Sequence, residues 1–347
     1  MISEIVLHNY KSFIDQKIKT APLTVLTGLN STGKSSIIKA IKIIKTAYLQ
    51  GVSVGDIDKT YNVFALKSKL VKEDSFFISL KFDETVFKYE VKNISDSRWD
   101  LLIFDIEDEK KIKFSSSVHY ISADRYGPKN TLPDGTVELI DSVGELGEYA
   151  ISYLEKNRYY KVPESLRLRA DSENLYDVVN DWLEVITPGV ILNYFFNPAT
   201  NEYSVTYNGI TPLETGFGLS AALPVLISLL CCKEKNVLLL ENPEMHLHPA
   251  AQSQVGRLLA KSASLGNQII IETHSDHIIN GIRIAVMEHE INCRDVTFHF
   301  LKRYDFEKST EVITPQIDER GKLSELPDGF FDQNLKDKAV LARRKHD

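Results

Sequence analysis

Cysteine is scarce in this sequence of 347 residues, and long hydrophobic runs are absent. The three cysteines, Cys231, Cys232 and Cys293, cannot form a disulfide framework and make no Cys-x-x-Cys pair, as is usual in a reducing cytosol. The longest apolar run, residues 221–232, has 12 residues and contains a proline, so it is too short to cross a bilayer. The first residues also lack the apolar core of a signal peptide. We therefore expect a soluble, cytoplasmic protein without membrane contact.

An excess of positive charge is absent as well. The chain has 41 lysines and arginines against 48 aspartates and glutamates, which gives a formal net charge of −7. This balance excludes a generally basic protein that binds nucleic acid over its whole surface, so such a contact needs a local basic patch or a partner. The composition that is there, 43% hydrophobic and 26% charged, is that of a globular protein and excludes long disordered tracts.

Alternating strand and helix patterns predict an α/β protein. The N-terminal part predicts two strands within 2–28, a helix at 34–49, and three or four antiparallel strands within 76–114 that turn at 83–84 and 93–97. The middle predicts a strand at 118–123, helices over 142–187, a hairpin at 191–207 and an apolar helix at 219–233. The last part predicts strands at 237–240, 269–272, 296–303 and 310–317, helices at 249–263 and 275–289, and a polar tail. Together they indicate a parallel core sheet, an antiparallel β layer and a helical insertion.

A glycine-rich loop separates the strand that ends near residue 27 from the helix that follows it. Residues 28–35, GLNSTGKS, match G-x-x-x-x-G-K-[ST] without a gap. In such a loop the backbone N–H groups and the helix N-terminus face phosphate oxygens, Lys34 reaches the β- and γ-phosphates, and the Ser35 hydroxyl binds Mg²⁺. A solvated lysine in a glycine-rich turn is the plainer interpretation. The position between a strand and a helix favours a nucleotide site.

Three further segments carry residues that suit such a site. Glu241 follows a buried strand, where a P-loop protein needs an acid to hold the metal's water shell. Residues 216–220, GFGLS, precede an apolar helix and suggest a second anion-binding N-terminus, although Ser220 also suits a simple N-cap. His274 follows another buried strand, where an imidazole can hydrogen-bond a γ-phosphate. Each of these residues also has a purely structural explanation, and the functional interpretation is favoured because a P-loop is present in the same sequence.

The order of these motifs resembles a known family. NYKSF, GLNSTGKSS, GFGLS, LLLENPEMHLHP and IIIETHSDH occur in the order found in ABC-type ATPase heads of the SMC, RecF and OLD kind. More narrowly, the chain is similar to the compact AAA ATPases of bacterial anti-phage defence operons, including the subunits of PARIS- and Septu-like systems. Residues 120–128 (YISADRYGP) and 326–333 (LPDGFFDQ) also look like segments of that group. The resemblance covers nearly the whole chain, with 145–210 the least characteristic part.

The resemblance implies one composite ATPase domain over residues 1–347. A lobe at 1–125 holds the P-loop, residues 126–220 form the insertion and the signature motif, and a lobe at 221–347 holds the Walker B acid, the switch histidine and the tail. The implied cofactors are ATP and Mg²⁺. The implied assembly is a head-to-head homodimer or higher oligomer, in which the signature motif of one chain reaches the γ-phosphate bound by its partner.

The resemblance also assigns individual residues. The Walker A loop would consist of Gly28, Asn30, Ser31, Thr32, Gly33, Lys34, Ser35 and Ser36. The signature motif would consist of Gly216, Gly218 and Ser220. Glu241 would be the Walker B acid and His274 the switch histidine. Lys11 and Phe13 would lie near the nucleotide, and Gln50 is a candidate for the Q-loop that joins Ser35 and Glu241 at the metal.

Two positions depart from the family's pattern. ABC heads place a glutamate directly after the Walker B acid as the general base, and this chain has Asn242 there. An amide cannot accept the proton, although it can orient a water molecule. Glu244 is a substitute if the loop folds back, so the sequence predicts hydrolysis that is slow or uses a displaced base. In the signature, Ala221 stands where relatives often have glutamine.

Two other patterns have competing interpretations. The histidines of 246–248 and 274–277 have metal-binding chemistry, but no zinc-type spacing is matched, so an independent metal site is the weaker interpretation. Residues 155–169 combine basic side chains with two tyrosines, which suits nucleic acid, but a solvated helix face is favoured.

The resemblance leads to two hypotheses for the function. The first is an ATPase that controls a separate effector, a nuclease or a toxin, in phage defence, because nothing in the sequence resembles a nuclease acid cluster. The alternative is a RecF-like ATPase of DNA maintenance that binds DNA directly. A transporter subunit is disfavoured by the NYKSF start, Asn242 and the lack of an LSGGQ sequence.

Overall fold

The computed structural model describes residues 1–49, 63–95, 98–103, 106–135, 141–231, 236–324 and 333–343. A six-stranded sheet in the order β14-β13-β3-β12-β11-β7 forms its centre. These strands are β3 (Leu23–Gly28), β7 (Val118–Ile121), β11 (Val237–Glu241), β12 (Gln268–Glu272), β13 (Val296–Lys302) and β14 (Glu311–Ile313). All neighbours are parallel except β14, which runs antiparallel to β13. The ends of β3, β11 and β12 therefore meet at one edge of the sheet, where ligands bind in open α/β folds.

Both faces of this sheet are buried, which explains why its strands are continuous apolar runs. Along β11, Leu238 and Leu240 belong to one hydrophobic core, and Val237 and Leu239 belong to the other. This alternation follows from the period of two along a strand. The sheet is thus the wall between two cores.

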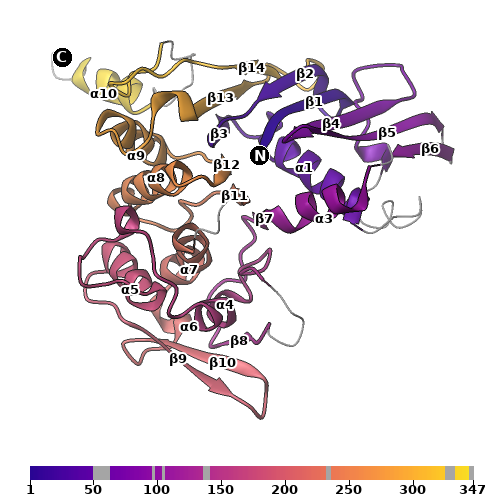
Figure 1. Cartoon of the computed structure of the whole chain (residues 1–347). Coiled ribbons are helices and arrows are strands. Elements are labelled where there is room, and N and C mark those ends of the chain that lie inside the picture. The colour runs from indigo at the N-terminus through magenta and orange to yellow at the C-terminus, as the bar shows by residue number, and fades with distance from the viewer. Residues whose placement is uncertain are drawn as a thin grey trace.

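Helices cover the first face, as Figure 1 shows for α5 (Leu175–Ile186), α7 (Phe217–Leu230), α8 (Pro249–Ser264) and α9 (Asp276–Met287). Helices α8 and α9 pack closely at two buried glycines. A Cβ on Gly256 would overlap the Ile278 carbonyl oxygen, and one on Gly281 would overlap that of Ser253. This contact needs residues without a side chain.

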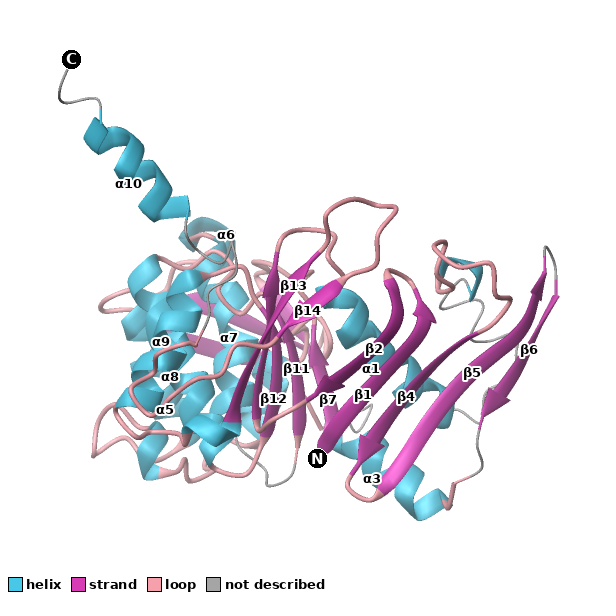
Figure 2. Ribbon diagram, turned by 90° about the horizontal axis from the view of Figure 1, so that it is seen from above, coloured by secondary structure: helices cyan, strands magenta, loops and turns pink. Residues whose placement is uncertain are grey.

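The second face carries α1 (Lys34–Leu49), α3 (Asp108–Ser117) and an antiparallel sheet in the order β2-β1-β4-β5-β6 (Figure 2). Its strands are β1 (Ile2–Tyr10), β2 (Phe13–Lys19), β4 (Phe76–Phe82), β5 (Thr85–Ser95) and β6 (Arg98–Ile103). Buried aromatic rings fill the space between this sheet and the helices. Phe87 and Phe114 lie 4.5 Å apart between ring centroids, and Tyr48 of α1 packs edge-on against Phe87 at 5.0 Å. This core fixes α1, and with it the loop before α1.

The remaining elements lie around these layers. The insertion lies at the bottom of Figure 1 and holds β8 (Thr131–Pro133), β9 (Leu192–Asn197), β10 (Glu202–Tyr207), α4 (Ala150–Lys156) and α6 (Pro212–Thr215). Short 3₁₀ helices span Val63–Ala65, Glu164–Leu166 and Cys293–Asp295, and α10 (Gln333–Arg343) lies beyond α9. No helix among the described residues is both long and apolar enough to cross a membrane.

The structure confirms the α/β class, the parallel core sheet, the antiparallel layer and the hairpin at 192–207. Three predictions of elements were wrong. Residues 2–28 form three strands, because β2 pairs with β1. The strands predicted within 76–114 end earlier than expected, because residues 108–117 form helix α3, whose first turn carries Asp108 and Glu109 at the positive helix end. Residues 142–187 are helical only in α4, a 3₁₀ turn and α5, and the polar tail contains α10.

Candidate functional site

The glycine-rich loop connects the end of β3 to the start of α1 at the ligand-binding edge of the sheet. Gly28 has a φ of 135°, and a Cβ there would overlap the Leu301 carbonyl oxygen of β13. The Lys34 ammonium is buried and donates hydrogen bonds to the carbonyls of Gly28 (3.1 Å) and Leu29 (2.8 Å). Burial lowers the Lys34 pKa, and Glu272 opposes this shift. The loop therefore curves around its own lysine.

The loop rests on residues from both ends of the chain. Gly33 has a φ of 102°, and a Cβ there would lie 2.8 Å from the Phe13 ring and 2.9 Å from Ser12 Oγ. Thr310 donates a hydrogen bond of 2.8 Å to the Thr32 carbonyl. Phe13 is fully buried, so it supports the loop from behind.

An open cleft of about 590 Å³ lies in front of the loop. This volume is within the range of about 300–1,000 Å³ typical of small-molecule sites. Cationic side chains dominate its polar lining, namely Lys11, Lys34, Lys67, Lys69 and Arg303. The cleft is also lined by Asn30, Ser31, Gly33, Ser35, Ser36, Glu272, His274 and Phe306. Lys67 is paired with Asp74, but the lining still holds four other cations against one carboxylate, which favours an anionic ligand.

Two glutamates end the strands beside the loop. Glu241 and Glu272 are paired in register on β11 and β12, and Glu272 also neighbours Leu26 of β3. Glu272 is 6% exposed, its Oε1 lies 3.9 Å from Lys34 Nζ, and it shares a hydrogen bond with the Ser35 side chain. Burial raises its pKa, and the Ser35 bond opposes that shift. Glu241 Oε2 accepts a hydrogen bond of 3.3 Å from the Ala123 backbone.

The loop after β11 folds back toward the segment after β12. Asn242 has a φ of 44°, a left-handed conformation that asparagine tolerates well. Glu244 Oε1 accepts a hydrogen bond of 2.9 Å from the His274 backbone, and burial raises the Glu244 pKa. Arg125 donates to the carbonyls of Glu241 (2.9 Å) and Asn242 (3.0 Å), and burial lowers the Arg125 pKa to about 10. Arg125 thus fixes the loop through its backbone.

His274 lies at the rim of the cleft, where its backbone is held by Glu244. The residue is exposed to solvent, and partial burial together with the charge of Lys34 lowers its pKa. The imidazole is therefore neutral at neutral pH and can both donate and accept a hydrogen bond.

The signature segment lies outside this cleft. Gly216, Gly218 and Ser220 are absent from its lining and form the start of α7. Gly218 packs on the loop after β11, because a Cβ there would lie 2.9 Å from the His246 carbonyl oxygen. Phe217 is 55% exposed, with its ring centroid 5.2 Å from that of His246. Around Gly216, with a φ of 86°, nothing lies within 4 Å of a Cβ position.

Sequence reasoning placed most of the cleft but missed part of it. The structure brings Lys11, Asn30, Ser31, Gly33, Lys34, Ser35, Ser36 and His274 to one cleft. Glu241 ends the strand beside Glu272, Thr32 is buried under the loop, and Gln50 lies outside the described residues. The missed residues are Glu272, Lys67, Lys69, Arg303 and Phe306. Of these, only Glu272 could have been found from the sequence, because it is a charged residue at the end of a predicted buried strand of isoleucines.

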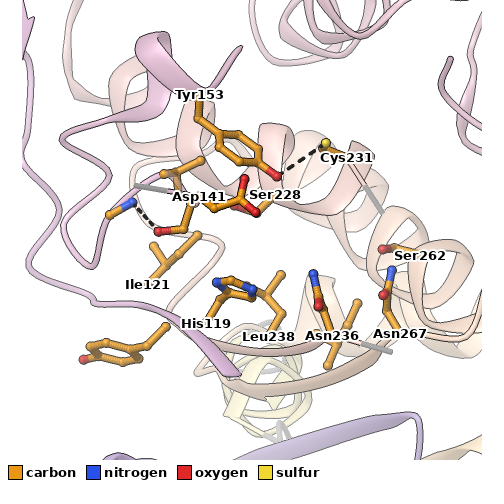
Figure 3. A pocket seen from close by; sticks show the side chains of 15 residues that line it. His119, Ile121, Asp141, Tyr153, Ser228, Cys231, Asn236, Leu238, Ser262 and Asn267 are labelled. Atoms are coloured by element: carbon orange, nitrogen blue, oxygen red, sulfur yellow. Dashed lines mark hydrogen bonds between the residues drawn. The ribbon is translucent and has the colours of Figure 1, made fainter. Parts of the chain in front are cut away.

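A second pocket lies at the opposite edge of the sheet, near the starts of β7, β11 and β12. Figure 3 shows its lining by His119, Asp141, Tyr153, Asn236 and Asn267. Its open space is about 40 Å³, which suits a few water molecules at about 10–15 Å³ each but is too small for a nucleotide. Among the described residues no group of three or more His, Cys, Asp or Glu side chains could hold a metal ion.

The basic segment 155–169 is neutralised by carboxylates. Each of its basic side chains forms an ion pair, Lys156 with Asp141, Arg158 with Glu155, Lys161 and Arg167 with Glu173, and Arg169 with Asp181 and Glu184. These carboxylates cancel the positive charge that would attract nucleic acid, so the structure favours a solvated face.

The sequence matches two known protein families. Residues 23–280 match the family described as "AAA domain, putative AbiEii toxin, Type IV TA system", and residues 291–341 match a protein family of unknown function, DUF3696. No curated protein matches the chain.

Solved structures share the fold at low sequence identity. An SMC head bound to the C-terminal winged-helix domain of ScpA is 14% identical, covers 92% of this chain and 98% of its own, and has a TM-score of 0.58. An SMC head with an extended coiled coil, bound to the C-terminal domain of ScpA derived from Pyrococcus furiosus, is 12% identical, covers 99% of each chain and has a TM-score of 0.57. The fold is thus that of an ABC-type ATPase head. Since the family match spans more than half of the sequence, this chain belongs to the AAA-domain family of the AbiEii toxin type.

Proposed function

We propose that this protein is an ATPase that binds ATP with Mg²⁺ in the P-loop cleft, closes into a head-to-head dimer and thereby controls a separate effector. The observation that carries the proposal is the cleft itself. A complete P-loop with Lys34 and Ser35 opens into a space lined by five cations, which matches the charge and the size of a nucleoside triphosphate. Family membership supports ATP as the ligand.

The residues at the loop suit a bound Mg²⁺. Ser35 and Glu241 would hold the ion with its water shell, and the ion would neutralise charge on the β- and γ-phosphates. A buried oxygen beside the loop supports a bound metal ion, since Glu272 Oε2 has no hydrogen-bond partner within the described part of the chain. Lys34 would bind the same phosphates once they replace the loop carbonyls as its partners.

The position of the signature segment outside the cleft supports dimerisation. Gly216, Gly218 and Ser220 form a helix start that suits a phosphate, yet they do not line the cleft of their own chain. A second copy placed head to head would bring its signature segment to the open side of this cleft. The exposed Phe217 and the open space around Gly216 support such a contact. The chain is then one composite domain, because strands from its beginning and its end share one sheet.

We propose slow hydrolysis, because the position after Glu241 holds an amide. Asn242 can orient the attacking water but cannot take its proton. Glu244 Oε1 accepts a hydrogen bond from the His274 backbone, while Glu244 Oε2 has no hydrogen-bond partner among the described residues. Glu244 therefore positions His274 and keeps one oxygen with which it could serve as a displaced base. ATP would then act mainly as a clamp that holds the dimer closed.

The effector is a separate protein, a nuclease or a toxin, in anti-phage defence. The family's description connects this AAA domain itself with a type IV toxin–antitoxin system, which supports a place in a system of more than one protein. Within the described part of the chain, the basic side chains of segment 155–169 are paired with carboxylates, which disfavours DNA binding there.

The test measures assembly and ligands together. Light scattering coupled to size-exclusion chromatography should show a monomer without nucleotide and a dimer with ATP and Mg²⁺. A gel shift with duplex DNA should show no binding by the isolated protein in either state. A monomer that stays a monomer in saturating ATP would refute the clamp, and tight DNA binding would favour a DNA-maintenance function instead.

A further inference from the structure

Glu272 is a buried carboxylate in a cleft that suits a polyanion. It is 6% exposed, it lines the cleft, and its Oε2 has no hydrogen-bond partner among the described residues. Its nearest cation, Lys34, is 3.9 Å away and donates its hydrogen bonds to loop carbonyls instead. A buried anion with an unused oxygen is costly unless a cation satisfies it.

Bound phosphates would make this cost larger. With the negative charges of a triphosphate in the same cleft, Glu272 would repel the ligand that Lys34 attracts. The repulsion becomes attraction if a divalent cation lies between the carboxylate and the phosphates, since the cation is then the largest local charge. Ser35 and Lys34 satisfy one oxygen of Glu272, and a metal ion would satisfy the other and remove the repulsion.

The sheet order places Glu272 at the centre of the site. Strand β12 lies between the P-loop strand β3 and the strand β11 that ends in Glu241. In register, Glu272 has Leu26 of β3 on one side and Glu241 on the other. It is therefore one strand nearer to the P-loop than Glu241, and it already shares a hydrogen bond with the side chain of Ser35.

We propose that Glu272 is a second acidic residue of the Mg²⁺ site, which holds the ion's water shell together with Ser35 and Glu241. The inference rests on the proposed ATP site and deepens it. It gives the metal two carboxylates on adjacent strands, and it explains the isolated charge at the end of an isoleucine strand. It also predicts that Glu272 contacts the metal's water shell, which it would not do if its only role were to pair with Lys34.

The test compares Glu272→Gln with the unchanged protein in two conditions. Affinity for the fluorescent analogue mant-ATP is titrated in EDTA and in Mg²⁺, and Mn²⁺ binding to the nucleotide complex is followed by electron paramagnetic resonance. In EDTA the variant should bind mant-ATP as tightly as the unchanged protein or more tightly, because a repulsive charge is gone. In Mg²⁺ it should lose affinity, and its Mn²⁺ affinity should fall about tenfold, as for other outer-shell partners of metals.

The control is Glu90→Gln, which removes a largely buried carboxylate that pairs with Lys88 and Lys92 in the antiparallel sheet, far along the chain from the P-loop. It should leave both titrations unchanged. Glu272→Asp keeps the charge on a shorter side chain and should fall between the unchanged protein and Glu272→Gln, with circular dichroism to check folding.

Three results would overturn the inference. Unchanged Mn²⁺ affinity in Glu272→Gln would show that the carboxylate does not hold the metal. An equal loss of mant-ATP affinity in EDTA and in Mg²⁺ would show that Glu272 only supports the loop through Lys34. Failure of the unchanged protein to bind mant-ATP in either condition would instead refute the proposed ATP site.

Discussion

The P-loop cleft and the signature segment are two parts of one proposed site, and they are built very differently. At the P-loop, Lys34 and Glu272 are buried, the glycines are fixed against backbone and ring atoms, and the loop rests on β13 and Phe13. At the signature segment, Phe217 is exposed and the space around Gly216 is open. The P-loop is therefore packed against its own chain, whereas the signature segment is exposed to solvent and free to contact another molecule. Ligand binding and dimerisation should therefore be separable by mutation.

The largest effect is expected at the P-loop lysine. Lys34→Ala should weaken ATP binding about 1,000-fold, because two charge-assisted contacts of about 1.5–3 kcal/mol each are lost. Isothermal titration calorimetry checks this, with Lys110→Ala on the exposed face of α3 as the control. Unchanged affinity in Lys34→Ala would show that the nucleotide binds elsewhere.

Glycine substitutions sharpen the comparison of the two parts. Gly28→Ala should cost about 3 kcal/mol or more of unfolding free energy, since a Cβ overlaps the Leu301 carbonyl in addition to the strained φ. Gly216→Ala should cost only about 1–2 kcal/mol, because it pays for the φ of 86° but meets no neighbour. Urea denaturation measures both, and equal costs would mean that the signature segment is as tightly built as the P-loop.

The exposed ring of the signature segment tests the dimer alone. Phe217→Glu should weaken ATP-dependent dimerisation at least about tenfold, because it places a charge in the contact, while ATP binding by the monomer stays unchanged. Phe195→Glu, at a 71% exposed ring of β9, is the matched control and should dimerise normally. Analytical ultracentrifugation with ATP distinguishes them, and a parallel loss of ATP binding in Phe217→Glu would contradict the separation.

The smallest effect is expected at the position of the missing base. Asn242→Glu should raise ATP turnover about threefold to tenfold, less than the roughly 100-fold that a well-placed general base supplies. The gain is limited because the φ of 44° costs glutamate more than asparagine. Steady-state phosphate release measures it, and Asn242→Gln, which cannot take a proton, is the control. No change in turnover would point to Glu244 or to a structural block at this loop.

Local patterns predicted the elements that dominate the site. The P-loop, strands β11 and β12, and the helices that follow them could be read from the sequence because buried strands are continuous apolar runs and because the loop motif fixes its own backbone. Strand β2 and helix α3 could not be predicted, because their polar sequences carry little periodic signal. Pairing with β1 determines the strand, and packing of Phe114 in the aromatic core determines the helix. The cations Lys67, Lys69 and Arg303 carry no motif, so only folding shows that they share a cleft.

The sequence by itself determined the chemistry of this protein: a loop for phosphates, an amide after Glu241 and a net charge that excludes a generally basic surface. The tertiary structure decided which of these residues meet. It placed β12 between β3 and β11, which brings Glu272 to Ser35, and it folded the loop after β11 so that Glu244 holds the His274 backbone. It also separated the signature segment from the cleft. Strand order and loop path depend on contacts between residues from 30 to more than 200 positions apart, and no local pattern encodes them.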